Sequence, residues 1–164
     1  LMGYLIPFMK FGFEAFCQKC VECGIDGVII PDLPFKDYEE TYKPIANRYD
    51  IRVIMLITPE TSEARVREID EHTDGFIYMV SSAATTGAQK DFDSQKQAYF
   101  KKIQDMHLRN PRMVGFGISN KQTFDAACAN SSGAIIGSRF VTLLNEAEGD
   151  AEKAITQLKE GLKK

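Results

Sequence analysis

The strongest constraint on the fold is a regular alternation of short apolar runs with segments of helical periodicity. Six runs rich in Val, Ile and Met have the length and composition of buried strands: 1–6, 27–33, 51–58, 76–81, 113–118 and 134–136. Apolar residues at helical spacing mark seven further segments: 11–23, 37–48, 62–71, 92–107, 121–129, 140–145 and 150–162. Nearly continuous Val/Ile strands are typical of a parallel sheet with helices on both faces, so the alternation predicts an α/β fold.

Glycines at the ends of the last two predicted strands narrow the choice of architecture. The sequences are "VGFGIS" at 114–119 and "GAIIGSRF" at 133–140. A strand that ends in glycine and leads into a helix leaves backbone N–H groups uncovered, as in many phosphate sites. An open nucleotide-binding sheet carries its glycines after the first strand, whereas barrels commonly bind phosphate after their last two strands. The pattern therefore favours a (β/α)8 TIM barrel.

Only six βα units are present where a closed barrel needs eight. We therefore expect this chain to hold strands three to eight of a barrel, without the two N-terminal units. No linker or low-complexity stretch interrupts the series, so residues 1–164 are predicted to form a single incomplete barrel domain. A capping box formed by Ser119 and Gln122 is expected to open the helix over 121–129.

Charge and hydropathy exclude two classes of partner. The chain has 20 Lys and Arg against 23 Asp and Glu, a net charge of −3, which predicts no basic surface for nucleic acid or anionic lipid. Its apolar runs are far shorter than the ~18–20 residues of a bilayer span, and no basic-then-apolar leader opens the chain. We expect a cytoplasmic protein.

Three closely spaced cysteines, at positions 17, 20 and 23, raise the question of a metal site. Two of them repeat with apolar neighbours at the spacing of one helix face: Phe13, Phe16, Cys17, Cys20 and Val21. The fourth cysteine, Cys128, is distant in sequence. We therefore expect buried packing residues and no metal. His72 and His107 are expected on helix surfaces.

Four segments, in order and spacing, closely resemble the tryptophan synthase alpha subunit family. They are "GIDGVIIPDLP" (24–34), "GFIYMVSSAATTGAQ" (75–89), "VGFGIS" (114–119) and "GAIIGS" (133–138). The resemblance implies a lyase of tryptophan biosynthesis that splits indole-3-glycerol phosphate into indole and glyceraldehyde 3-phosphate. It also implies an alpha2-beta2 complex, in which indole passes to a beta subunit that carries pyridoxal phosphate. The alpha subunit itself needs no cofactor.

Position by position, the resemblance implies a phosphate site made mostly of backbone N–H groups, at Gly87, Gly117, Gly137 and Ser138. It assigns Tyr78 to substrate contact, Phe116 to the wall of the indole pocket and Thr86 to closure of a mobile loop. It places Asp32, Leu33 and Pro34 at the interface with the beta subunit.

Three positions depart from the familiar family pattern: Ile6, Ser82 and Ala84. The departures put the energetics of loop closure and the coupling to the beta subunit in question. The catalytic Glu and Asp of the family follow its second strand and have no counterpart in this sequence. The 164-residue chain alone is therefore predicted to be inactive.

Two alternatives stay open on the sequence. One is a non-catalytic phosphate-binding or partner-regulating barrel fragment. The other is a different phosphate-binding barrel, such as a phosphosugar isomerase, which would need Lys or Glu at several strand ends. The predicted strands instead end at Leu33, Thr58, Ser81, Ser119 and Ser138.

Overall fold

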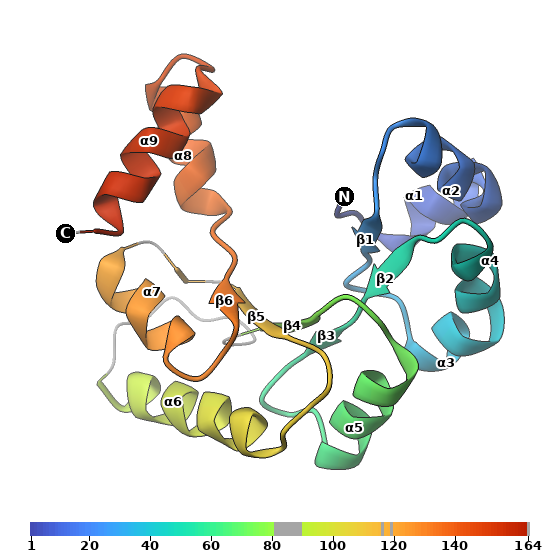
Figure 1. The fold of residues 1–164 in the computed structure, drawn as a ribbon, viewed down its shortest axis with the longest axis horizontal. Coiled ribbons are helices and arrows are strands. Elements are labelled where there is room, and N and C mark those ends of the chain that lie inside the picture. Colours follow the sequence, from blue (N-terminus) through green and yellow to red (C-terminus); the bar gives the residue numbers. More distant parts are fainter. Residues whose placement is uncertain (81–89, 116, 119, 164) are drawn as a thin grey trace. The chain divides into compact units, whose positions relative to one another are not determined.

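A computed structural model describes residues 1–80, 90–115, 117–118 and 120–163, in which helices and strands alternate along the chain (Figure 1). The chain forms two compact units. The first contains Leu1–Tyr78 and Leu108–Pro111, and the second contains Met79–His107 and Arg112–Lys164. Hydrogen-bonded strand neighbours follow chain order in both sheets, β1-β2 and β3-β4-β5-β6, as expected for successive βα units.

Two short parallel strands lie in the first unit. Strand β1 (Gly27–Ile29) pairs with β2 (Arg52–Ile54), with Val28 opposite Val53. The predicted strand over 51–58 is interrupted at Met55, after which β3 (Leu56–Ile57) begins. Val28, Val53 and Ile57 are all buried, in keeping with their apolar character.

The predicted strand over 1–6 is wrong except for a single parallel bridge between Met2 and Ile29. Helix α1 (Leu5–Phe11) begins immediately afterwards. The carboxylate of Asp32 accepts a hydrogen bond from the Leu5 amide at 2.8 Å, which satisfies a helix N-terminal donor from a distant loop. Pro7 falls in the first turn, where its missing N–H costs no intrahelical bond.

Five helical segments follow α1 in the first unit: α2 (Phe13–Glu22), α3 (Phe35–Asp37), the π-helix η1 (Tyr38–Tyr42), α4 (Lys43–Arg48) and α5 (Glu63–His72). Gly12 separates α1 from α2 with a φ of +88°, a conformation that favours glycine. The Ser62 side chain caps α5 by accepting from the Arg65 amide.

The inner face of α2 confirms the packing interpretation for Cys17 and Cys20, whereas Cys23 is exposed. Cys17 and Cys20 are 0% and 1% exposed, and the Phe13 ring packs edge-on against Tyr42 with centroids 4.8 Å apart. Val21 was expected on this face but is 54% exposed, so the buried stripe is narrower than predicted. His72 lies on the surface of α5, as expected, whereas His107 is exposed but lies beyond the last helical residue, Asp105, with a φ of +51°, so its predicted place on a helix is wrong.

The second unit begins at Met79, within β4 (Ile77–Val80). Its further elements are α6 (Lys90–Asp105), β5 (Arg112–Gly115), α7 (Lys121–Cys128), β6 (Gly133–Ala134), α8 (Ser138–Glu146) and α9 (Ala151–Gly161). Helices α8 and α9 pack on one another (Figure 1) around buried Leu143, Ala147 and Ala154. Strands β5 and β6 pair in parallel.

The cap of α7 differs from the predicted one by a single residue. Asn120 accepts from the Thr123 amide at 2.9 Å, and the Thr123 hydroxyl accepts from the Asn120 amide at 3.2 Å. This is a reciprocal capping box at Asn120 and Thr123, so the box predicted at Ser119 and Gln122 is wrong. Asn caps helices as well as Ser does, so local sequence could not separate the two registers.

Candidate functional site

Gly117 and Gly137 follow two neighbouring strands, β5 and β6, at equivalent positions. Val114 of β5 and Ala134 of β6 are register partners, and the Ile135 amide donates to the Val114 carbonyl at 2.7 Å. Gly117 comes three residues after Val114, and Gly137 comes three residues after Ala134. Because the strands are parallel, their carboxyl ends lie at the same edge of the sheet, the edge at which barrels place functional groups.

The conformations of the two glycines differ. Gly117 has a φ of +77°, in the left-handed region that side chains beyond glycine rarely adopt. Gly137 has an ordinary φ of −98°. Apart from its chain neighbours, no heavy atom of the described residues lies within 4 Å of the point where a Cβ on Gly137 would stand. The packing of the described residues therefore does not require glycine at position 137.

Helix α8 begins directly after Gly137, which is its N-cap residue. The Gly137 carbonyl accepts from the Val141 amide at 3.1 Å, but no side chain among the described residues caps the helix. Ser138 is the first helical residue and is exposed. Uncapped first-turn amides carry the positive end of the helix dipole, so this terminus suits an anion.

Sequence reasoning missed one cation at this edge of the sheet. The ammonium nitrogen of Lys96, on α6, lies 3.9 Å from the point where a Cβ on Gly117 would stand. No sequence motif signals this approach, because it depends on how α6 packs beside the end of β5.

Tyr78 is the second residue of β4 and is 5% exposed. Burial raises the pKa of its hydroxyl above the usual value of 10.0, so the phenol is neutral at physiological pH and can donate a hydrogen bond. Its predicted contact with substrate stays a prediction. Three further predicted site residues, Thr86, Gly87 and Phe116, lie outside the described residues.

The loop assigned to a partner interface adjoins α1. Asp32 and Pro34 are exposed, and the Asp32 carboxylate holds the Leu5 amide. Leu33 is 7% exposed, so its side chain contributes to the core of the first unit. Exposed apolar side chains gather on and just before α1: Tyr4, Ile6, Met9 and Phe11. Such a cluster is typical of a surface that binds another protein.

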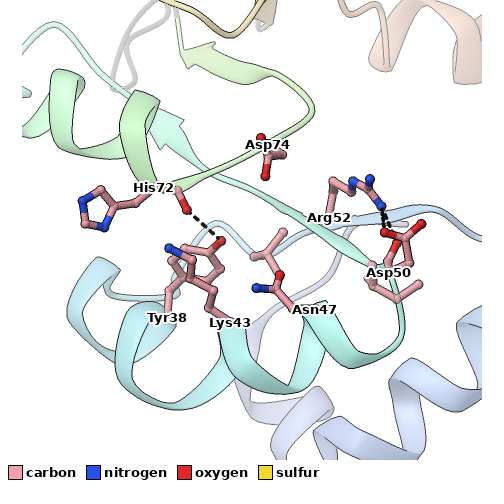
Figure 2. A pocket seen from close by; sticks show the side chains of 9 residues that line it. Tyr38, Lys43, Asn47, Asp50, Arg52, His72 and Asp74 are labelled. Carbon is pink, nitrogen blue, oxygen red and sulfur yellow. Dashed lines mark hydrogen bonds and ion pairs between the residues drawn. The ribbon is translucent and has the colours of Figure 1, made fainter.

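A separate polar pocket of about 220 Å³ lies at the amino end of β2 in the first unit (Figure 2). Its labelled lining residues are Tyr38, Lys43, Asn47, Asp50, Arg52, His72 and Asp74. Burial, followed by the charges of Asp74 and Glu39, raises the pKa of Tyr38 to about 12. The Tyr38 hydroxyl donates to the His72 carbonyl at 3.4 Å.

The charges around this pocket are paired with one another. Glu39 forms an ion pair with Lys43 and a hydrogen bond with Nδ1 of His72, and Arg52 forms an ion pair with Asp50. The pocket also lies at the amino ends of strands, where barrels place stabilising groups in place of catalytic ones. We therefore assign it a structural role.

Metal and membrane sites receive no support from the part of the chain described. No three His, Cys, Asp or Glu residues among the described positions form a group able to hold a metal ion. None of the helices described is both long and apolar enough to cross a membrane.

Comparison with known proteins places these observations in a family. A family model described as tryptophan synthase alpha chain matches residues 1–164. The tryptophan synthase alpha chain of Bacteroides fragilis is 79% identical over 159 residues, which are 97% of this chain and 60% of the relative. That of Bacteroides thetaiotaomicron is 78% identical over 162 residues, covering 99% and 63%. The chain thus spans about 60% of the length of these relatives.

Solved structures give the same result at lower identity. The alpha subunit from Campylobacter jejuni superposes with a TM-score of 0.80 at 29% identity, covering 98% of this chain and 63% of that one. The subunit from Pyrococcus furiosus gives 0.82 at 26% identity, covering 99% and 64%. These are TIM barrels, so the predicted barrel fold is confirmed, with this chain representing part of it.

Proposed function

Because the chain belongs to the tryptophan synthase alpha chain family, we propose that it is part of a lyase subunit acting on indole-3-glycerol phosphate. The products would be indole and glyceraldehyde 3-phosphate. We also propose that residues 1–164 form a single incomplete barrel domain and that the reaction needs no cofactor in this subunit. Pyridoxal phosphate would belong to the beta subunit that consumes the indole.

The observation that carries the proposal is the register-matched pair of glycines, Gly117 and Gly137. Both follow parallel strands at the same edge, and the second opens α8 with uncapped amides. A phosphate at this edge would accept from backbone N–H groups near Gly117, Gly137 and Ser138. The open space beside Gly137 leaves room for the anion to approach the main chain. Gly87 is proposed to complete the cradle.

The indole end of the substrate would meet other groups. Tyr78, whose hydroxyl is neutral at physiological pH, is proposed to contact the substrate, and Phe116 is proposed to form part of the wall of the indole pocket. Thr86 is proposed to act in loop closure over the bound substrate.

Bond cleavage needs an acid for the indole ring carbon and bases for the indole nitrogen and the glycerol hydroxyl. Two described carboxylates follow strands, those of Asp32 and Glu60. Asp32 holds the Leu5 amide, and Glu60 accepts from the Thr58 hydroxyl at 3.0 Å in an exposed turn. Both serve local structure, so we propose that the 164 residues alone do not catalyse cleavage. The family's catalytic Glu and Asp would do this work in the full-length protein.

We propose that the beta subunit docks on α1 and the loop that begins at Asp32. The two segments are tied by the hydrogen bond from the Leu5 amide to Asp32, and Ile6 and Met9 expose 61% and 57% of their surface beside it. Pro34 is exposed in the same loop. The buried side chain of Leu33 would support this surface from beneath.

The phosphate assignment can be tested with Gly137→Val in the full-length protein. The described chain leaves space for the added side chain, so the fold should survive while the side chain occupies the anion's place. Losing one or two charge-assisted hydrogen bonds, at roughly 1.5–3 kcal/mol each, should raise the Kd for glycerol phosphate about 10- to 100-fold or more. Indole has no phosphate, and its Kd should not change.

Equal losses for glycerol phosphate and indole, or an unchanged Kd for glycerol phosphate, would overturn the assignment. A melting curve for each variant separates a folding defect from a binding defect. The alternative function, a phosphate-binding module without catalysis, predicts normal glycerol phosphate binding but no release of indole by the full-length protein.

A further inference from the structure

Lys96 lies at the same sheet edge as the glycines but belongs to a different element. Its ammonium nitrogen stands 3.9 Å from the Cβ position above Gly117, and Gly117 itself is exposed at the end of β5. A group placed against the Gly117 backbone from the solvent side would therefore meet this nitrogen as well as the main chain.

The packing of α6 fixes where the Lys96 side chain begins. The next residue, Gln97, donates to the Ala126 carbonyl at 3.2 Å and accepts from the Asn130 side chain at 3.3 Å. Phe100 and Ile103 of the same helix are buried, with 3% and 2% of their surface exposed. The helix is thus held against α7 and the turn that follows it, so the reach of Lys96 toward Gly117 follows from the fold.

A cation at this point differs from the backbone groups of the cradle. Backbone N–H groups carry only partial charges, whereas a phosphate monoester bears about 1.5 to 2 negative charges at pH 7. An ammonium group is a compact full charge with three donors, and lysine commonly binds phosphate in this manner. The glycines shape the site, and the lysine would supply the opposite charge.

We propose that Lys96 is an additional binding residue of this site that recognises the doubly charged phosphate monoester of the substrate. This inference rests on the proposed function, because it takes the edge at Gly117 and Gly137 as the phosphate site. Part of the affinity for phosphate would then come from a side chain of α6, in addition to the backbone N–H groups near Gly117, Gly137 and Ser138.

The test measures binding of glycerol phosphate to the full-length protein at low and at high ionic strength. Lys96→Gln should raise the Kd about tenfold at low salt and less at high salt, because the lost attraction is screened. Lys96→Arg keeps the charge and should bind close to the parent protein. Lys101→Gln is the matched control, since it makes the same charge change on α6 at a lysine paired with Asp105 at 2.9 Å.

The control should leave the Kd unchanged. Equal effects of Lys96→Gln and Lys101→Gln would overturn the inference, because only net charge would then matter. A Kd for Lys96→Gln equal to that of the parent would also overturn it.

Gly137→Val separates this inference from the proposed function. If Gly137→Val weakens binding while Lys96→Gln does not, the phosphate site stands and the role of Lys96 fails. If Lys96→Gln weakens binding while Gly137→Val does not, the lysine binds phosphate but the glycine cradle is misassigned. If neither variant weakens binding, both proposals fail.

Discussion

Asn110 donates its backbone amide and its side-chain amide to the carboxylate of Asp70, at 2.8 and 3.0 Å, across 40 residues of sequence. The backbone amide of Arg109 donates to the same carboxylate at 2.7 Å. Asp70 and Asn110 are both buried. The end of α5 is thereby fastened to the segment that leads into β5, and one carboxylate satisfies three donors.

Asp70→Ala should destabilise the protein by about 2–4 kcal/mol, because it leaves the buried backbone amide of Asn110 and the partly buried amide of Arg109 without their acceptor. The midpoint of urea unfolding measures the loss. Asp74→Ala is the control, since it removes an exposed carboxylate whose ion pair with Arg109 is expected to contribute at most about 1 kcal/mol. A similar loss of unfolding free energy in the two variants would contradict the idea that the buried position of Asp70 makes its hydrogen bonds important.

Gly75→Ala should cost about 1–3 kcal/mol of stability. Gly75 has a φ of +104°, and an added Cβ would stand 2.9 Å from Cδ1 of Ile54. Gly161→Ala, at the end of α9, is the matched control. Apart from its chain neighbours and the backbone of its own helix, no described atom lies within 4 Å of its Cβ position, and alanine there should be neutral or slightly stabilising. Thermal melts of the two variants should therefore shift in different directions or by clearly different amounts.

The stability of the fold should fall at alkaline pH through Cys17. Burial raises the pKa of its thiol from 9.0 to about 11, with smaller contributions from Cys20 and Glu14. The folded state thus favours the neutral thiol. Its contribution to stability is complete below pH 9, where the unfolded thiol is also neutral, and is lost as pH rises toward 11.

Urea unfolding at pH 8 and pH 10 tests this expectation. Cys17→Ala should lower stability at both values through lost packing, but with a smaller difference between them than in the parent protein. An equal pH dependence in the two proteins would show that other groups, such as the Tyr38 hydroxyl, account for the alkaline loss.

Ile6→Ser should weaken binding of the full-length protein to the beta subunit, because it removes an exposed apolar side chain from the proposed docking surface. A several-fold rise in the Kd is expected in a titration of beta subunit. Ile155→Ser, on α9, replaces another exposed isoleucine, 41% exposed, and should have no effect. Equal weakening by both changes would argue against docking on α1.

The alternation of apolar runs was enough to predict the α/β fold, because each periodicity reports which face of an element is buried, and the glycines after the last two predicted strands favoured the barrel. It failed at residues 1–6, where a short apolar run suits a strand or a helix equally. There helix α1 begins with an amide, that of Leu5, whose acceptor is the carboxylate of Asp32, a residue distant in sequence. The cap of α7 was displaced by one residue for a local reason, since Ser119 and Asn120 are both good capping residues.

In the candidate site, too, some features could be predicted from local sequence and others could not. Gly117 and Gly137 could be predicted because a glycine after an apolar strand is a local pattern. The proximity of Lys96 to Gly117 could not, because it requires α6 to be packed in place. The same holds for the bonds between Asp70 and Asn110, whose polar side chains give no sign in the sequence of sharing a buried network.

The space beside Gly137 has an evolutionary consequence. Gly75 is required by backbone conformation and by the Ile54 side chain, whereas the described chain would accept a side chain at position 137. Selection for folding therefore acts on Gly75, and under the proposed function selection for substrate acts on Gly137. In a lineage that obtained tryptophan from its surroundings, residue 137 should drift first while residue 75 stayed glycine, so the two positions would record the loss of the pathway separately from the loss of the fold.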